Sequence, residues 1–208
     1  MKTPEFFNDV TPIVMQDPLS ALLGTCEEGL LVYTYCDIVK LTGHSCPTVA
    51  GAYLMIQHGV KALYGDELPV RGNIILRIKG AFGEGSLGVI ANVASMITGA
   101  TDESGFHGLG GEFDRRGLLS YHHDIEGELQ LERTDTGAYV IVNYDPSCVP
   151  PSPEMGRLMP LVLSHRADAS EVKLFGTLWQ ERVQRLLIDH QHDPRLIQCS
   201  LPRYKGKK

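Results

Sequence analysis

The chain has 208 residues, of which 43% are hydrophobic and 21% charged, and its formal net charge at pH 7 is −6. This composition excludes a disordered chain and is typical of a globular protein with a sizeable core. The negative charge argues against a general nucleic-acid binder. No apolar run reaches the roughly 18–20 residues of a membrane span and no secretory signal is evident, so we expect no membrane contact.

The five cysteines are scattered, odd in number and without a C-x-x-C pair. Free thiols in a reducing compartment explain this pattern better than a disulfide framework does. We therefore expect a cytoplasmic protein.

Apolar periodicity and turn residues predict strands and helices in alternation. Residues 4–15 and 18–23 are short helical candidates. Residues 30–41 are rich in β-branched and aromatic side chains and are predicted to form a strand, although their second half could start a helix. Residues 47–64 carry apolar side chains at helical spacing, and Gly65, a typical residue after a helix end, follows them.

The rest of the chain continues this alternation, and four prolines within residues 146–153 mark a linker. We expect an α+β fold: a mostly antiparallel sheet with helices packed on one side. Residues 1–150 would form this core domain, and residues 151–208 a C-terminal helical extension packed on the core or at a dimer interface. The remaining predicted elements are strands at residues 74–80, 118–123, 128–133 and 138–144 and helices at residues 87–98, 152–163 and 169–188.

The most informative motif is Gly43-His44-Ser45-Cys46-Pro47, immediately before the helix at residues 47–64. Proline suits the first turn of a helix, so Cys46 falls at or next to the N-cap, where free N–H groups and the helix dipole favour a thiolate. A thiolate with an imidazole two residues away indicates a reactive or a metal-binding site. The alternative is a buried structural cysteine beside a hydrogen-bonded loop histidine.

Two glycine-rich segments follow. Residues 82–88 match the pattern G-x-G-x-x-G, but they lack the βαβ context of a dinucleotide site, so we interpret them as a turn leading into the next helix. Residues 100–113 form a long loop with embedded His, Asp and Glu, which indicates either a functional loop or a mobile surface loop.

The motif and the order of elements after it resemble the E-type subunit family of formylmethanofuran dehydrogenase, in which the corresponding segment reads Gly-His-x-Cys-Pro-Gly. The resemblance covers roughly residues 35–145 and is specific at the first motif. It implies a metal-binding protein, either a component of a one-carbon oxidoreductase or a stand-alone protein. The chain departs from the family at Thr48, where glycine is usual, and at Ala100, which replaces the loop cysteine. The helix cysteine and a C-terminal four-cysteine zinc module are also absent from the sequence.

The resemblance carries His44 and Cys46 over as metal ligands. We expect the glycine-rich loop to fold over the motif and to bring His107 to them as a third ligand, with His122 or His123 in reserve. Such a set would hold a divalent transition ion, most simply Zn²⁺, and leave an open position for water or a small-molecule substrate.

Three functions are open at this point. The first is a metal-binding protein with metal-dependent or oxidoreductase-related activity. The second is a metal-free enzyme with Cys46 as nucleophile and His44 or His107 as base. The third is a non-catalytic assembly subunit. The apolar face of residues 169–188, which includes Phe175 and Trp179, further predicts a homodimer that uses this region.

Overall fold

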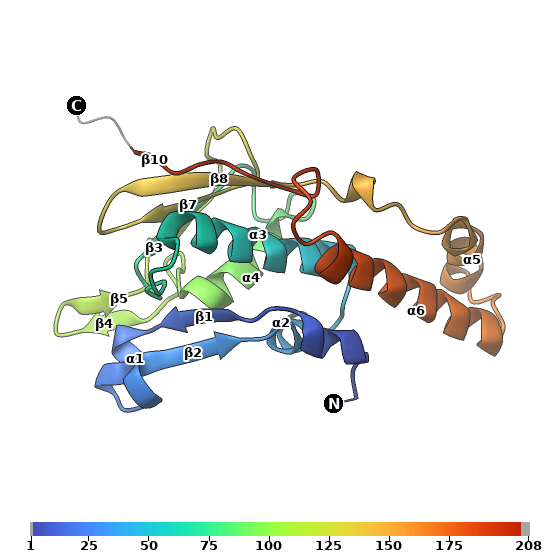
Figure 1. The fold of residues 1–208 in the computed structure, drawn as a ribbon, viewed down its shortest axis with the longest axis horizontal. Helices are drawn as coiled ribbons and strands as arrows, with labels where there is room; N and C mark the ends of the chain where they lie inside the picture. Colours follow the sequence, from blue (N-terminus) through green and yellow to red (C-terminus); the bar gives the residue numbers. More distant parts are fainter. Residues whose placement is uncertain (1, 205–208) are drawn as a thin grey trace.

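Two long helices lie against one face of a six-stranded sheet in the computed structural model, which describes residues 2–204 (Figure 1). The fold is α+β, as the sequence predicts. The strands are β1 (Ile13–Gln16), β2 (Leu30–Tyr33), β3 (Ile74–Ile78), β4 (His107–Leu109), β5 (Glu112–Asp114), β6 (Leu119–Ser120), β7 (Leu129–Arg133), β8 (Ala138–Tyr144), β9 (Ile197–Cys199) and β10 (Arg203–Tyr204). The helices are α1 (Pro18–Leu22), α2 (Tyr35–Thr42), α3 (Pro47–Tyr64), α4 (Leu87–Thr98), α5 (Pro153–Leu163) and α6 (Ala169–Gln184).

The six-stranded sheet is mixed, with one parallel pairing. Its order is β10–β8–β7–β3–β6, and β9 also pairs with β8. β7 and β8 form the predicted antiparallel hairpin, β3 pairs antiparallel with β7, and β6 joins β3 in parallel. Alternate side chains of β3 are fully buried, which shows that they lie on the face of the sheet that the helices cover. These side chains are Ile74, Leu76 and Ile78.

The helices α3 and α4 run in the same direction across this face. α3 starts beside the last residue of β8, because the Tyr144 hydroxyl donates to Pro47 O at 2.7 Å. α4 starts after β3 and ends near its beginning, where Gly72 N donates to Thr98 O at 2.8 Å. The ends of β3 and β8 lie at the same edge of the sheet, since both strands pair antiparallel with β7. Both helices therefore begin at one end of the molecule.

The N-terminal part differs from the prediction. Residues 4–15 form a 3₁₀ turn (Glu5–Asp9) and then β1, which pairs antiparallel with β2, instead of a helix. The predicted strand at residues 30–41 ends at Tyr33, and its second half forms α2, the alternative that the sequence leaves open. The reason is a capping box, in which the Thr34 and Asp37 side chains each bond to the other residue's backbone N–H.

The C-terminal segment supplies strands as well as helices. α5 and α6 form a hairpin that projects from the body (Figure 1). A π-helical turn, Arg185–Asp189, then places Leu186 and Leu187 in the main core. The chain returns along β8 as β9 and β10, which are too short to show a period in the sequence. None of the described helices combines the length and the apolar character that crossing a bilayer requires.

Glycines allow α3 to approach the sheet closely. A side chain at Gly51 would clash with the Tyr144 ring of β8, and one at Gly59 would press on Leu131 of β7. The Tyr144 ring cannot move aside freely, because its hydroxyl is bonded to the first turn of α3. α3 and α4 otherwise have the limits that the sequence predicts.

Replacing Gly51 by alanine should destabilise the protein by about 1–2 kcal/mol, because the overpacking against Tyr144 outweighs the gain in helix propensity. Gly176 of α6 is the matched control, since nothing lies within 4 Å of its missing side chain. Gly176→Ala should stabilise the protein by about 0.5–1 kcal/mol. Urea unfolding measures both variants, and a Gly51→Ala protein as stable as the wild type would contradict the close contact.

Candidate functional site

The turn before α3, residues 43–46, has the conformation that the motif predicts. Gly43 ends α2 with a left-handed backbone, φ 75°. Cys46 is the N-cap of α3, and its Sγ accepts a hydrogen bond at 3.4 Å from a backbone N–H of the first turn. His44 is exposed, and its Nδ1 contacts Thr42 O at 3.0 Å. The imidazole thus contacts its own loop rather than the thiol. We call this segment the α3 turn.

Helix α6 covers the α3 turn. Trp179 Nε1 and Gln180 Nε2 both donate to Ser45 O, at 3.0 and 3.2 Å. The Tyr35 hydroxyl shares a hydrogen bond with Ser45 Oγ at 3.0 Å. Cys46 is half-buried beneath these contacts. The C-terminal segment is therefore bonded to the residue that precedes the thiol.

The structure does not bring His107 to His44 and Cys46. Residues 107–114 form the β4–β5 hairpin, in which His107 pairs with Asp114. The hairpin lies near the end of α4, whereas the α3 turn lies at the opposite end of the helix pair (Figure 1). α3 has 18 residues, so its ends are about 27 Å apart. Because α4 runs parallel to α3, a loop that follows α4 starts at the far end.

No metal centre is assembled within residues 2–204. This part of the chain holds no group of three or more His, Cys, Asp or Glu side chains that could hold a metal ion. His44 and Cys46 therefore lie in the same turn without a third ligand from the described residues. The reserve ligands His122 and His123 lie in a separate cleft.

This cleft, of about 690 Å³, opens at the start of α4. The N-cap residue Ser86 makes no side-chain hydrogen bond to α4, whereas N-cap side chains do so in the other five α-helices of the described chain. Leu87 N and Val89 N of the first turn already donate to Glu84 O and Ser86 O, at 3.0 and 3.1 Å. Gly88 N, the positive end of the helix dipole and the exposed Lys79 ammonium are left to favour an anion there. We call it the α4 cleft. Its lining residues are Lys79, Gly80, Glu84, Gly85, Ser86, Leu87, His122, His123, Asp124 and Glu128.

Two adjacent histidines form one wall of the α4 cleft. His122 has a left-handed backbone, φ 61°, which costs a non-glycine residue about 1 kcal/mol or more. Backbone N–H groups of both residues donate to carbonyls at the end of β3, at 3.0 and 3.1 Å. Ser120 Oγ lies 2.7 Å from His123 Nε2, so Nδ1 is the ring nitrogen left for a ligand. Burial, and then the Arg77 charge, lowers the pKa of His123, so this ring is neutral at pH 7.

Glu128 is a half-buried carboxyl in the same cleft. Burial raises its pKa, against the opposing effects of a hydrogen bond from Tyr144 N to Oε2 at 3.1 Å and of the Lys79 charge. The pKa of Glu128 is thus raised and that of His123 lowered, so the two pKa values move toward each other. Tyr144 also bonds to Pro47 O, so one residue links the α4 cleft to the α3 turn.

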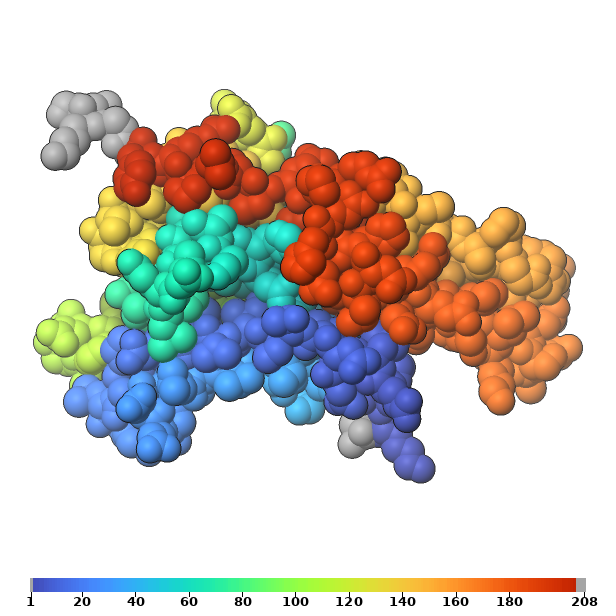
Figure 2. Space-filling view, in the orientation of Figure 1, coloured from blue at the N-terminus to red at the C-terminus, as the bar shows by residue number. Residues whose placement is uncertain are grey.

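A second hollow, of about 530 Å³, lies between β1, α3 and the C-terminal segment. In Figure 2 the C-terminal half of α3 is recessed between these segments. The pKa of His58 is lowered there by burial, but His58 Nε2 already bonds to Gln191 O at 2.7 Å. Lys61 is paired with Asp66. The α4 cleft is the stronger candidate, because it combines an uncapped helix start with acid and base groups.

Sequence reasoning finds part of the α4 cleft. The glycine-rich residues 82–88 do form a turn into α4, and this turn also lines the cleft. His122 and His123 are visible in the sequence only as reserve metal ligands. Lys79 and Glu128 carry no signal, because each is a single charge beside a strand. Only the pairing of β3 with β7 places these two residues together.

No protein-family model and no curated protein matches this chain. The resemblance to the formylmethanofuran dehydrogenase family therefore rests on the motif residues alone.

Replacing Glu128 by glutamine should raise the stability of the protein at pH 7. A folded-state pKa above the ordinary value of about 4.3 means that stability is lost as the pH rises through it, because the native state must bury a charge. The advantage of Glu128→Gln should therefore vanish below about pH 4. Urea unfolding between pH 4 and 7.5 measures it. Glu126→Gln, at an exposed neighbouring position, is the control. A wild type more stable than Glu128→Gln at pH 7 would contradict the burial of charge.

Proposed function

We propose that the chain binds a small anionic molecule in the α4 cleft and moves a proton to or from it. The observation that supports this proposal most directly is the uncapped start of α4, which faces a cleft that also holds Lys79, His123 and Glu128. An anionic group of the ligand, such as a carboxylate or a phosphate, would bind to Gly88 N in the first turn and to the Lys79 ammonium.

His123 and Glu128 supply the proton chemistry in this proposal. In this proposal the neutral His123 ring carries its proton on Nε2 and donates it to Ser120 Oγ, so Nδ1 keeps a free lone pair and acts as the base. Glu128, whose pKa is raised by burial, is the acid that returns a proton. The strained backbone of His122 is of the kind that concentrates at functional sites.

Titration with inorganic phosphate, followed by ¹H–¹⁵N NMR, tests the binding step. We expect the largest shifts at the amides of Gly85 and Gly88 at the start of α4. Lys79→Ala should weaken binding about tenfold, which corresponds to about 1.4 kcal/mol. Lys61→Ala is the matched control, because Lys61 is an exposed lysine near the opposite end of α3.

Two results would contradict the proposal. One is a pattern of phosphate-induced shifts that leaves the start of α4 unchanged. The other is equal affinity in the wild type, Lys79→Ala and Lys61→Ala, which would mean that the anion is not held at the cleft.

Zinc binding at the α3 turn, with the activity that the formylmethanofuran dehydrogenase resemblance implies, stays a second prediction. The half-buried N-cap position of Cys46, two residues from the exposed His44, favours it. All five cysteines are free, as we expect of a protein in a reducing compartment such as the cytoplasm. Elemental analysis of wild type and Cys46→Ala measures the metal. Stoichiometric zinc that is lost in the variant would support the site, and equal content would rule it out.

The α5–α6 hairpin supports the predicted homodimer. Its exposed apolar side chains include Leu163, Val172 and Leu174, of which 72%, 49% and 41% are exposed. A second copy that packs on the projecting hairpin would remove this apolar surface from water. Light scattering at tens of micromolar should give the mass of a dimer, and the mass of a monomer would contradict this association.

A further inference from the structure

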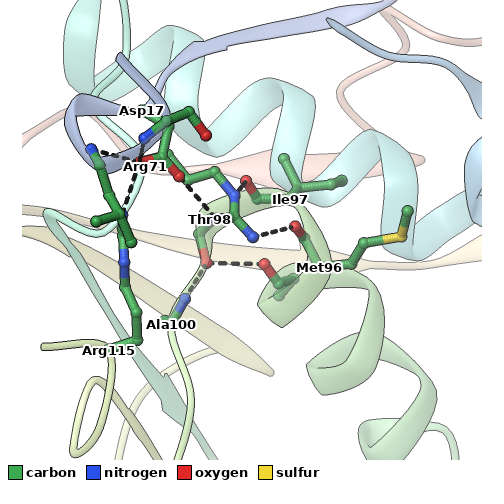
Figure 3. A network of polar contacts seen from close by, with 10 residues as sticks. Asp17, Arg71, Met96, Ile97, Thr98, Ala100 and Arg115 are labelled. Carbon is green, nitrogen blue, oxygen red and sulfur yellow. Dashed lines mark hydrogen bonds and ion pairs between the residues drawn. The ribbon is translucent and has the colours of Figure 1, made fainter. Parts of the chain in front are cut away.

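A buried charge network lies at the other end of α4 from the proposed cleft. The guanidinium groups of Arg71 and Arg115 converge on the Asp17 carboxylate (Figure 3). Asp17 is 2% exposed and Arg115 is 5% exposed. Two cations thus share one carboxylate in the interior, where an unbalanced charge is strongly disfavoured.

Every nitrogen of the Arg71 guanidinium has a partner. Nη1 donates to Asp17 Oδ2 at 2.8 Å, Nε donates to Ile97 O at 3.2 Å, and Nη2 donates to Met96 O at 3.1 Å. The last two acceptors belong to the C-terminal turn of α4. The negative end of the helix dipole therefore offsets part of the Arg71 charge.

Arg115 is not satisfied in this way. Its Nη2 donates to Asp17 Oδ1 at 2.8 Å, but Nε and Nη1 are buried and have no hydrogen-bond partner within residues 2–204. The same Asp17 oxygen also accepts from Leu19 N and Ser20 N. One carboxylate oxygen thus serves three donors, while two nitrogens of a buried cation have no acceptor. Buried polar groups without partners are rare, and an unseen water or ion often explains them.

Backbone surrounds the Arg115 guanidinium closely. Gly72, φ 88°, lies so near Nη1 that any side chain there would clash with it. A side chain at Gly99, φ 75°, would come within 3.2 Å of Nη1 and 3.0 Å of Arg71 Nη1. Such surroundings have no place for a large ligand. Any occupant beside Arg115 must therefore be small.

We propose that a small monovalent anion of about the size of chloride binds beside Arg115 and accepts hydrogen bonds from Nε and Nη1. The anion balances the second guanidinium, which Asp17 and the end of α4 leave unmatched. It joins the loop at residues 70–73 and the segment after β5 to the end of α4. This site is separate from the α4 cleft, so the two proposals stand or fall independently.

Crystals grown or soaked in bromide test the site directly. An anomalous bromine peak within about 3.5 Å of Arg115 Nε or Nη1 is expected. Thermal unfolding gives a second measurement, with chloride replaced stepwise by gluconate at constant ionic strength. The midpoint should rise by about 3–6 °C when chloride reaches roughly ten times its dissociation constant.

The variant Arg115→Lys keeps the positive charge but loses the guanidinium donors, so its unfolding midpoint should not depend on chloride. Arg203→Lys is the matched control, because Arg203 forms an exposed ion pair with Glu126 and its replacement should leave the chloride effect intact. If Arg115→Lys does not fold, the bromide and chloride measurements on the wild type still test whether an anion binds beside Arg115. The proposal would be overturned if no bromine peak appears at the site and the midpoint of thermal unfolding does not change with chloride. The two donors of Arg115 would then be assigned to buried water.

Discussion

The contact between Gly51 of α3 and the Tyr144 ring of β8 is the constraint on which the functional end of the molecule depends. The ring occupies the space that a side chain at residue 51 would fill, and its hydroxyl bonds to the first turn of α3. The start of α3 is thereby held at the end of β8. The backbone N–H of the same tyrosine bonds to Glu128, so the acid group of the α4 cleft is positioned by the residue that positions the helix.

The parallel course of α3 and α4 separates two kinds of chemistry. Where both helices begin, Cys46 caps α3, and Lys79, His123 and Glu128 line the cleft at the start of α4. Where α4 ends, its carbonyls accept hydrogen bonds from Arg71, and a second arginine lies behind it. The two ends of one helix thus attract opposite charges, as the helix dipole requires. The N-terminal end of α4 can attract a negatively charged ligand group directly. The C-terminal end can bind an anion only with the help of arginine side chains.

The C-terminal segment has more influence on the site than its composition suggests. Trp179 and Gln180 of α6 both bond to the carbonyl of Ser45, the residue before the cysteine of the motif. Their donor groups meet an acceptor more than 130 residues away in the chain. Helical periodicity indicates that α6 has an apolar face, but it does not indicate which turn that face meets.

The sequence alone determined the limits of α3 and α4, the β7–β8 hairpin and the N-cap position of Cys46, because each depends on neighbouring residues: apolar spacing, proline at a first turn and glycine at a helix end. Only the tertiary structure decided that His107 lies at the opposite end of the helix pair from Cys46 and that Lys79, His123 and Glu128 share a cleft. These distances depend on the direction of α4 and on the pairing of β3 with β7 and β6, which bring distant segments together. Local sequence patterns contain no record of that pairing, because hydrogen bonds between strands join backbone groups that every residue carries.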